Sequence, residues 1–212
     1  ILIEDSRNHN IVNNTISNNG RYGIYDWCCF YDTISNNSIT GNTYGVYIGG
    51  CGDANITGNH IFDNGHYGVY IWGCEHFNVS KNYIFDNGLH GILISSSESI
   101  NISNNVFQND DITIRGSYLI EWNTHTIVGN TANGRPIYYY KNVNGIAVPS
   151  DAISVILANC TNVTIDGINA NNVDVGIELG YCSNCTIKNS LIKDNYEGIM
   201  LRDSDRNMIY GN

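Results

Sequence analysis

The residues best suited to acid–base chemistry are the adjacent carboxylates Asp110 and Asp111, followed by Arg115. Two carboxyl groups can act as general acid and general base on a glycosidic bond. The sequence therefore allows a polysaccharide-active lyase, hydrolase or epimerase with its site near residues 110–135, where Glu121 and Arg135 are further candidates. A structural explanation competes with this one, because Asp110 also occupies a repeated asparagine position.

Aromatic residues recur at regular intervals and could hold sugar rings. Tyr25, Tyr47 and Tyr70 each follow a buried Ile or Val, so strand alternation turns them outward. A second column contains Tyr22, Tyr44, Tyr67 and His90, with Trp27 and Trp72 nearby. We predict a ligand-binding strip formed by Tyr25, Tyr47, Tyr67, Tyr70 and Trp72. The alternative is that outward tyrosines stack only on one another.

Metal ligands are sparse. Asp63 and Asp86 share an outward column and could bind Ca²⁺ between coils together with Asp110 or Asp111, although a solvated acidic edge is the commoner explanation. No other cofactor is expected. The six histidines do not share a column, and the Cys-x2-Cys pair at 182 and 185 is not matched by a second one, which gives little support to copper or zinc.

Cysteines are also periodic. Cys28, Cys51 and Cys74 are 23 residues apart, and Cys160 and Cys182 are 22 apart. We predict buried columns of small side chains. A disulfide between neighbouring coils is the alternative, because adjacent coils place equivalent residues within disulfide range. Cys29 and Cys185 fall outside the predicted columns and could pair or be free.

Asn-x-Ser/Thr triplets are frequent, and in a secreted protein they are glycosylation acceptors. The candidates are Asn13, Asn36, Asn55, Asn78, Asn101, Asn159, Asn162 and Asn184. The repeat itself favours Asn-Ile-Ser/Thr, so we expect at most a subset to be modified.

All these residues lie on a repeat of 22 or 23 residues with the core Ile-x-x-Asn-x-Ile. The two asparagine columns are Asn14, Asn37, Asn59, Asn82 and Asn105, and then Asn19, Asn42, Asn64 and Asn87. Each unit holds three short alternating segments, which bury their apolar side chains only when unit stacks on unit. The sequence therefore predicts an all-β, right-handed, single-stranded parallel β-helix, with asparagine ladders at the bends.

The repeat is interrupted once. We predict one β-helix domain over residues 1–212, with regular coils at 1–114 and 153–212 and irregular coils at 115–152. The irregular part should contain a hairpin that turns at Asn142–Gly145. Both ends resemble pieces of repeat, so we interpret the chain as an excerpt whose ends are capped by further domains or subunits.

The segments "NTISNNGRYGIY", "NITGNHIFDNGHYGVYI" and "SNCTIKNSLIKDNYEGIML" resemble the NosD-like, CASH-type parallel β-helix proteins. The stretch "NGRPIYYYKNVNGIAVPSDAISVILANCTNVTI" is similar to a segment of archaeal cell-surface members. The resemblance implies an extracellular or cell-surface location, with the periplasm and a copper-related role as alternatives.

Enzyme signatures are incomplete. Asp110-Asp111 and His90-Gly91 resemble elements of polygalacturonases, but their order is reversed and no Arg-x-Lys follows. The Asp-Pro-His element of alginate epimerases and the paired arginines of pectate lyases are absent.

The charge of the chain limits the kinds of partner that it can bind. A net charge of −10 disfavours nucleic acid and anionic membranes, and no apolar run reaches membrane-spanning length. We therefore expect an extracellular scaffold that assembles with copies of itself or binds glycans, with the polysaccharide-active enzyme as the main alternative.

Overall fold

The computed structural model describes all residues, 1–212, and shows stacked coils of three short strands. Strands of one sheet come from successive coils and pair in parallel, in the regular coils at offsets of 22 or 23 residues, as for Tyr22 with Tyr44 and Tyr44 with Tyr67. The predicted all-β parallel β-helix is confirmed. One short helix, α1 (Ile120–Asn123), interrupts the strands. It is far too short to cross a membrane, and no longer apolar helix occurs.

The first stack has three sheets. Sheet 1 carries the longer strands: β1 (Leu2–Glu4), β4 (Tyr22–Trp27), β7 (Tyr44–Gly49), β10 (Tyr67–Trp72), β13 (His90–Ser95) and β16 (Ile112–Arg115). Sheet 2 contains β2 (Asn10–Val12), β5 (Thr33–Ser35), β8 (Asn55–Thr57), β11 (Asn78–Ser80), β14 (Asn101–Ser103) and β17 (Thr126–Val128). Sheet 3 contains β3 (Thr15–Ser17), β6 (Ser38–Thr40), β9 (His60–Phe62), β12 (Tyr83–Phe85), β15 (Val106–Gln108) and β18 (Thr131–Ala132).

The short strands bury their middle residue. In sheet 2 the chain places Ile34, Ile56, Val79 and Ile102 in register, each almost fully buried. Their neighbours point outward, because side chains alternate along a strand. The period-2 pattern within each segment and the 22-residue period between segments therefore build one continuous apolar core.

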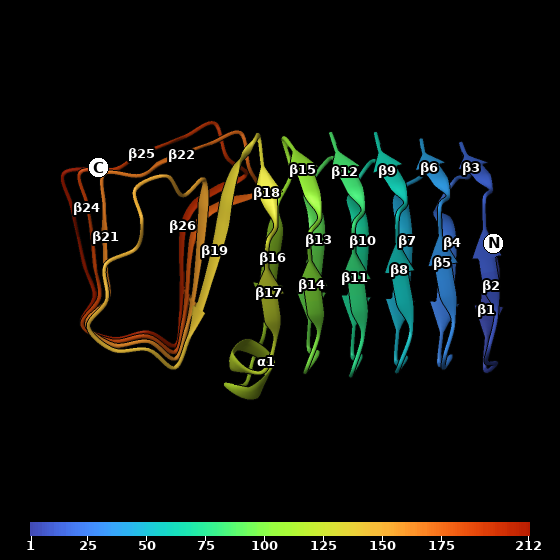
Figure 1. Cartoon of the computed structure of the whole chain (residues 1–212), viewed down its shortest axis with the longest axis horizontal. Helices are drawn as coiled ribbons and strands as arrows, with labels where there is room; N and C mark the ends of the chain where they lie inside the picture. Colours follow the sequence, from blue (N-terminus) through green and yellow to red (C-terminus); the bar gives the residue numbers. More distant parts are fainter.

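A second stack follows the interruption. Its strands are β19 (Arg135–Lys141), β20 (Ser154–Ala158), β21 (Thr164–Asp166), β22 (Asn169–Asn171), β23 (Val175–Gly180), β24 (Thr186–Lys188), β25 (Leu191–Lys193), β26 (Glu197–Arg202) and β27 (Met208–Tyr210). Figure 1 views the first stack from its side and the coils of the second stack nearly along their own axis, so the two stacks run in different directions.

The predicted hairpin at Asn142–Gly145 is wrong. The chain reverses instead at Asn133 and Gly134, which both have positive φ, so that β18 and β19 pair antiparallel. An Asn-Gly pair of this geometry is typical of a two-residue hairpin turn. β19 then pairs in parallel with β20 and becomes the first strand of the second stack.

The second stack covers the end of the first. β20 and β23 are buried on both faces. Val155 and Leu157 belong to the core of the second stack, whereas Ile156 and Ala158 belong to the core of the first. Trp122 of α1 is fully buried beside this junction and donates its indole N–H to the carbonyl of Gly116. One stack thereby caps the other, which protects the open end of a solenoid.

Candidate functional site

Sheet 1 presents a continuous set of aromatic rings in contact, some stacked and others tilted or edge to face. Tyr25, Tyr47 and Tyr70 lie in register on β4, β7 and β10, with ring centroids 5.1 and 5.2 Å apart. All three are half-buried. Each follows an inward Ile or Val, so its outward position results from strand alternation.

A second column runs beside the first and crosses between the two stacks. The centroids of Tyr22, Tyr44, Tyr67 and His90 are separated by 5.2, 5.4 and 5.6 Å. His90 then contacts Tyr196, just before β26, at 5.4 Å. Sequence analysis missed Tyr196, because nothing in the repeat relates the second stack to His90.

Trp27 and Trp72 lie two coils apart but stack on each other at 5.5 Å. Gly49 is the residue between them in the register, and any side chain there would collide with Trp27. We call the rings of Tyr22, Tyr25, Trp27, Tyr44, Tyr47, Tyr67, Tyr70, Trp72, His90 and Tyr196 the aromatic face.

The aromatic face is electrically neutral over a wide pH range. Burial raises the pKa of Tyr47 to about 12, and it also raises the pKa values of Tyr25, Tyr67 and Tyr70. Cations are scarce here, because the Arg115 guanidinium pairs with the Glu197 carboxylate at 2.6 Å. The guanidinium of Arg21 lies 4.8 Å from the ring centre of Tyr22. The face therefore offers flat apolar rings with neutral hydroxyl groups.

The proposed catalytic carboxylates lie elsewhere. Asp110 and Asp111 have no exposed surface and are enclosed at the junction of the two stacks. Asp110 continues the asparagine ladder, since its Oδ2 accepts the side-chain N–H of Asn87 at 2.7 Å. Placement of these two carboxylates on an open substrate site was wrong, because the second stack covers the end of β16 and excludes solvent.

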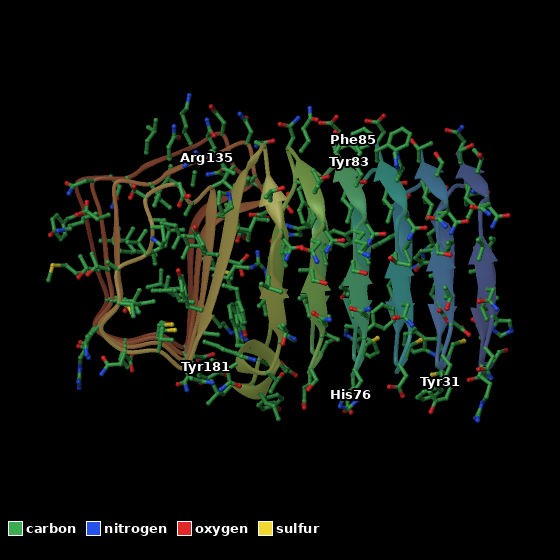
Figure 2. The ribbon with its side chains drawn as sticks, viewed as in Figure 1. Tyr31, His76, Tyr83, Phe85, Arg135 and Tyr181 are labelled. Carbon is green, nitrogen blue, oxygen red and sulfur yellow. The ribbon has the colours of Figure 1, made fainter.

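The other members of that cluster are also dispersed. Glu121 accepts the backbone N–H groups of Ser117 and Tyr118 at the start of α1. Arg135 donates to the backbone carbonyls of Ala152 and Asn169. Figure 2 places Arg135 at one edge of the molecule, and Figure 1 places α1 at the opposite edge. The structure does not bring these residues into one catalytic group.

Carboxylates from the second stack bind the exposed backbone edge of the first. Asp174 Oδ2 accepts the N–H of Gly91 at 2.7 Å and that of Asp111 at 2.9 Å. Glu178 Oε2 accepts the N–H of Ile114 at 3.1 Å. Asp111 and Ile114 lie beside and on β16, the last strand of sheet 1, so their N–H groups have no further coil to pair with and the two acids replace the missing strand. Together with Asp110 and Asp111 they form what we call the junction cluster.

Burial strongly perturbs the junction cluster. Desolvation raises the pKa of Asp174 to about 7 and that of Glu178 to about 8. Desolvation, with repulsion from Asp174, also holds the pKa values of Asp110 and Asp111 well above their usual range. Burial lowers the pKa of the adjacent His90 to about 4, so this imidazole is neutral at pH 7 and cannot balance the acids.

The predicted calcium ligands do not converge. Asp63 and Asp86 lie at exposed positions in one column, at the end of β9 and β12. The next member of that column is Asn109, which donates to Asp86 at 2.7 Å. The proposed grouping with Asp110 or Asp111 is therefore wrong, because those side chains point into the junction.

The asparagines form buried hydrogen-bonded ladders. In one column, Asn37, Asn59, Asn82, Asn105 and Asn130 follow one another, each side chain donating to the next Oδ1 at 3.0 Å. Asn14, at the exposed start, donates to Asn37 in the same way. The second column links Asn19, Asn42, Asn64 and Asn87.

The cysteine column needs one correction. Its members are Cys29, Cys51, Cys74 and Ser97, each backbone N–H pointing at the next sulfur or hydroxyl. Cys28, placed there from its 23-residue spacing, is instead half-buried at a bend with positive φ. The reason is that this coil has 22 residues, as the pairing of Tyr22 with Tyr44 shows. Cys160, Cys182 and Ser204 form the equivalent column of the second stack, and all seven cysteines are free thiols.

The Asn-x-Ser/Thr sites lie mainly on the surface. Asn78 is half-buried and the others are exposed: Asn13, Asn36, Asn55, Asn101, Asn159, Asn162 and Asn184. Asn55, Asn78 and Asn101 hydrogen-bond to one another along sheet 2. A glycan on any of these three would have to break that surface ladder.

A second aromatic group, missed from the sequence, lies on sheet 3. Phe62 stacks on Phe85 at 4.7 Å, and Tyr83 lies 4.7 Å from Phe85. Figure 2 shows Tyr83 and Phe85 at one edge of the first stack. Beside them is an open hollow of about 390 Å³, bounded by Tyr83, Gln108 and the turn at Asn133 and Gly134. The signal was available in the matching "HIF" and "YIF" segments.

Comparison with known proteins agrees with this geometry. The family model "Right handed beta helix region" matches residues 1–153, so the chain belongs to the right-handed β-helix family. The model "Periplasmic copper-binding protein (NosD)" matches residues 139–212, which confirms the NosD-like type. No curated protein matches the chain.

Similar solved structures are distant. The periplasmic alginate epimerase AlgG is 14% identical with a TM-score of 0.48, over 99% of this chain and 47% of that one. Tailspike protein 2 of Escherichia coli O157:H7 bacteriophage CAB120 is 15% identical with a TM-score of 0.48, over 94% and 27%. The A-module of the Azotobacter vinelandii mannuronan epimerase AlgE6 is 14% identical with a TM-score of 0.43, over 99% and 56%. The chain spans about half or less of the length of AlgG and the tailspike protein, and 56% of the AlgE6 module.

The segment that matches the copper-binding model does not itself fit a copper site. All six histidines precede residue 139. Within 139–212, the sulfurs of Cys160 and Cys182 form hydrogen bonds with the backbone inside the cysteine column. The one group of His, Cys, Asp or Glu ligand atoms that converges within 4.8 Å lies in the first stack. We therefore assign no copper chemistry to this segment.

Proposed function

We propose that this chain is an extracytoplasmic β-helix scaffold whose aromatic face binds neutral polysaccharide. The observation that supports it best is the unbroken row of half-buried tyrosines on successive coils, whose ring centroids lie 5.1 to 5.4 Å apart. An aromatic ring presents an apolar face and, in tyrosine, a hydroxyl that donates and accepts hydrogen bonds. A chain of sugar rings has the same combination of apolar C–H faces and hydroxyl groups.

The charges support a neutral glycan rather than an acidic one. The chain carries a net charge of −10, and its nearest arginines are held by Glu197 or by the Tyr22 ring. An anionic polymer would need unpaired cations on the binding surface. Apart from Tyr70, whose hydroxyl has Ser95 as a partner, the tyrosine hydroxyls of the face have no bond within the protein; the other bonded ones belong to Tyr83, Tyr138, Tyr139 and Tyr181.

The location outside the cytoplasm is part of the proposal. It is supported by the match to a family described as periplasmic, and the numerous exposed Asn-x-Ser/Thr sites are compatible with a cell-surface position. The dispersal of Asp110, Asp111, Glu121 and Arg135 favours a binding scaffold over a polysaccharide-active enzyme.

The test is retention on neutral polysaccharides in native affinity electrophoresis. We expect Tyr47→Ala and Tyr70→Ala each to weaken retention about tenfold, because each removes aromatic contacts of about 1 kcal/mol with the ligand and with its neighbours. Tyr118→Ala is the matched control, since Tyr118 is 69% exposed and lies outside the face. Circular dichroism should stay unchanged in all three.

Two results would overturn the proposal. Equal retention of the parent and both face variants would make the aromatic face purely structural. A change in sedimentation coefficient without a change in retention would make it a contact between copies of the chain.

A further inference from the structure

The second coil of the first stack contains an acid where its neighbours are apolar. Asp26 pairs with Ile3 on one side and Ile48 on the other, and Ile71 and Ile94 continue the column. Its side chain is 0% exposed. A buried carboxylate needs a positive partner, since removing it from water costs several kcal/mol.

No protein group supplies that partner. Asp26 Oδ2 has no hydrogen-bond partner. The partners of its carboxylate are the thiols of Cys29 and Cys51, the latter 3.8 Å from Oδ1. The carboxylate therefore points into the interior beside sulfur, with no lysine or arginine to compensate it.

Two further metal-ligand side chains converge on Asp26. Cys29 and Asp32 follow it by three and six residues, and both are buried. Their ligand atoms and that of Asp26 all lie within 4.8 Å of one another. His9 of the preceding coil lies outside this group of three but contacts one of its members, its Nδ1 lying 3.2 Å from Asp32 Oδ1.

This combination occurs in one coil only. At the positions of Asp26, Cys29 and Asp32, the next coil has Ile48, Cys51 and Ala54. The coil after it has Ile71, Cys74 and Phe77 in the same positions. The backbone is the same in all three, so the repeat does not require the two acids. Asp32 accepts the backbone N–H of His9 at 2.7 Å, but the Asp26 carboxylate accepts no backbone N–H, so its presence calls for a function at this coil.

We propose that Asp26, Cys29, Asp32 and His9 bind one divalent cation of the zinc type inside the first stack. A sulfur ligand disfavours Ca²⁺ and Mg²⁺, which take oxygen. Cys, His and Asp together are zinc ligands, usually four in tetrahedral geometry. With metal–ligand bonds of about 2.0–2.3 Å, ligand atoms in such a site lie about 3.3–3.8 Å apart. Asp26, Cys29 and Asp32, within 4.8 Å of one another, would have to approach by about 1 Å, and the His9 ring would have to turn from Asp32 toward the metal.

Bound metal would join two coils, because His9 lies on the first coil and the other three ligands lie on the second. It would also balance the buried carboxylates. The site therefore acts as a structural cross-link between two coils close to the N-terminal end of the stack, independent of the aromatic face and of glycan binding.

The experiment uses the full chain, stripped with a chelator and titrated with Zn²⁺, and with Co²⁺ as the spectroscopic probe. We expect one Zn²⁺ per chain, a thiolate-to-Co²⁺ charge-transfer band and a higher Tm with metal. Cys29→Ser should abolish the band and weaken Zn²⁺ binding at least about tenfold. Cys74→Ser is the matched control, because Cys74 occupies the same column with Ile71 and Phe77 beside it.

A second variant keeps the test decisive if Cys29→Ser folds poorly. Asp26→Ile restores the apolar column, so it should fold with unchanged circular dichroism, raise the Tm of the metal-free chain and bind no Zn²⁺. Absence of stoichiometric Zn²⁺ in the parent would overturn the proposal. So would equal binding by the Asp26→Ile variant, or equal losses in Cys29→Ser and Cys74→Ser.

Discussion

The asparagine ladder inside the first stack and the junction cluster at its end satisfy the same kind of buried backbone group in opposite ways. In the ladder, each amide both accepts and donates, so the chain of bonds passes from coil to coil without charge. At the junction, Asp174 and Glu178 accept backbone N–H groups, but the oxygens of Asp111 and one oxygen each of Asp110 and Glu178 have no partner.

The difference follows from what lies beyond each residue. Inside the stack an identical coil follows, and asparagine can bond to its own copy. At the end no copy follows, and the covering surface belongs to strands running in another direction. Carboxylate side chains can bond to backbone N–H groups even though the strands of the two stacks run in different directions. These carboxylates nevertheless remain shielded from water and close to one another. The ladder should therefore be indifferent to pH, whereas the junction should respond to it.

The largest expected effect comes from breaking the ladder at its centre. The Asn82 Oδ1 accepts from the backbone and side chain of Asn59, and its Nδ2 donates to Ile56 O and Asn105 Oδ1. Asn82→Ala removes four buried hydrogen bonds, at about 1 kcal/mol each, so the free energy of unfolding should fall by about 4 kcal/mol. Urea denaturation measures this loss.

Asn101→Ala is the control for that measurement. Asn101 belongs to the exposed ladder on sheet 2, where it donates to Asn78 at 3.0 Å in contact with water. Water replaces the lost bond, so the cost should stay below about 0.5 kcal/mol. Equal losses in the two variants would show that burial does not govern the strength of the ladders.

The next effect is the pH dependence of the junction. In the unfolded chain Asp and Glu ionise near their ordinary pKa values, about 4. In the folded chain the pKa values of Asp174 and Glu178 are about 7 and about 8, so the folded chain binds more protons above pH 4. Stability is therefore lost as the pH rises through these values, by about 2 kcal/mol between pH 7 and pH 9.

The double variant Asp174→Asn, Glu178→Gln isolates this contribution. It keeps oxygen acceptors for the N–H groups of Gly91 and Ile114 but removes two titrating groups. His90 does not interfere, because it is neutral throughout this range. We expect the unfolding free energy of the variant to depend less steeply on pH than that of the parent. Parallel pH profiles would mean that the junction acids are solvated.

The same contrast explains which parts of the structure could be predicted. The ladder columns, the strand positions and the outward tyrosines could be predicted from the sequence because every coil repeats them. The junction was not, since its bonds join residues such as Gly91 and Asp174, 83 positions apart, that share no pattern. One signal of the junction is present in the sequence. In the run "AISVILA", apolar residues occupy both alternating sets of positions, which is typical of a strand buried on both faces.

Two other misses came from local signals that were present in the sequence. The Gly23–Gly45 spacing of 22 residues would have placed Cys29, and not Cys28, above Cys51. Asp26 stands where the aligned coils have Ile, so it is visible in the sequence as an exception within an apolar column. Exceptions to a repeat are informative because the repeat itself cannot account for them.

The smallest expected effect tests how the chain passes from the first stack to the second. Gly134 has a φ of +75° in the turn that reverses β18 into β19, and L-residues with a side chain adopt this conformation at a cost. Gly134→Ala should lower the unfolding free energy by about 1 kcal/mol. Gly20→Ala is the matched control, since Gly20 is likewise free of neighbours within 4 Å but lacks positive φ. If both substitutions are neutral in urea denaturation, the turn is held by the strands on either side and not by its own backbone preference.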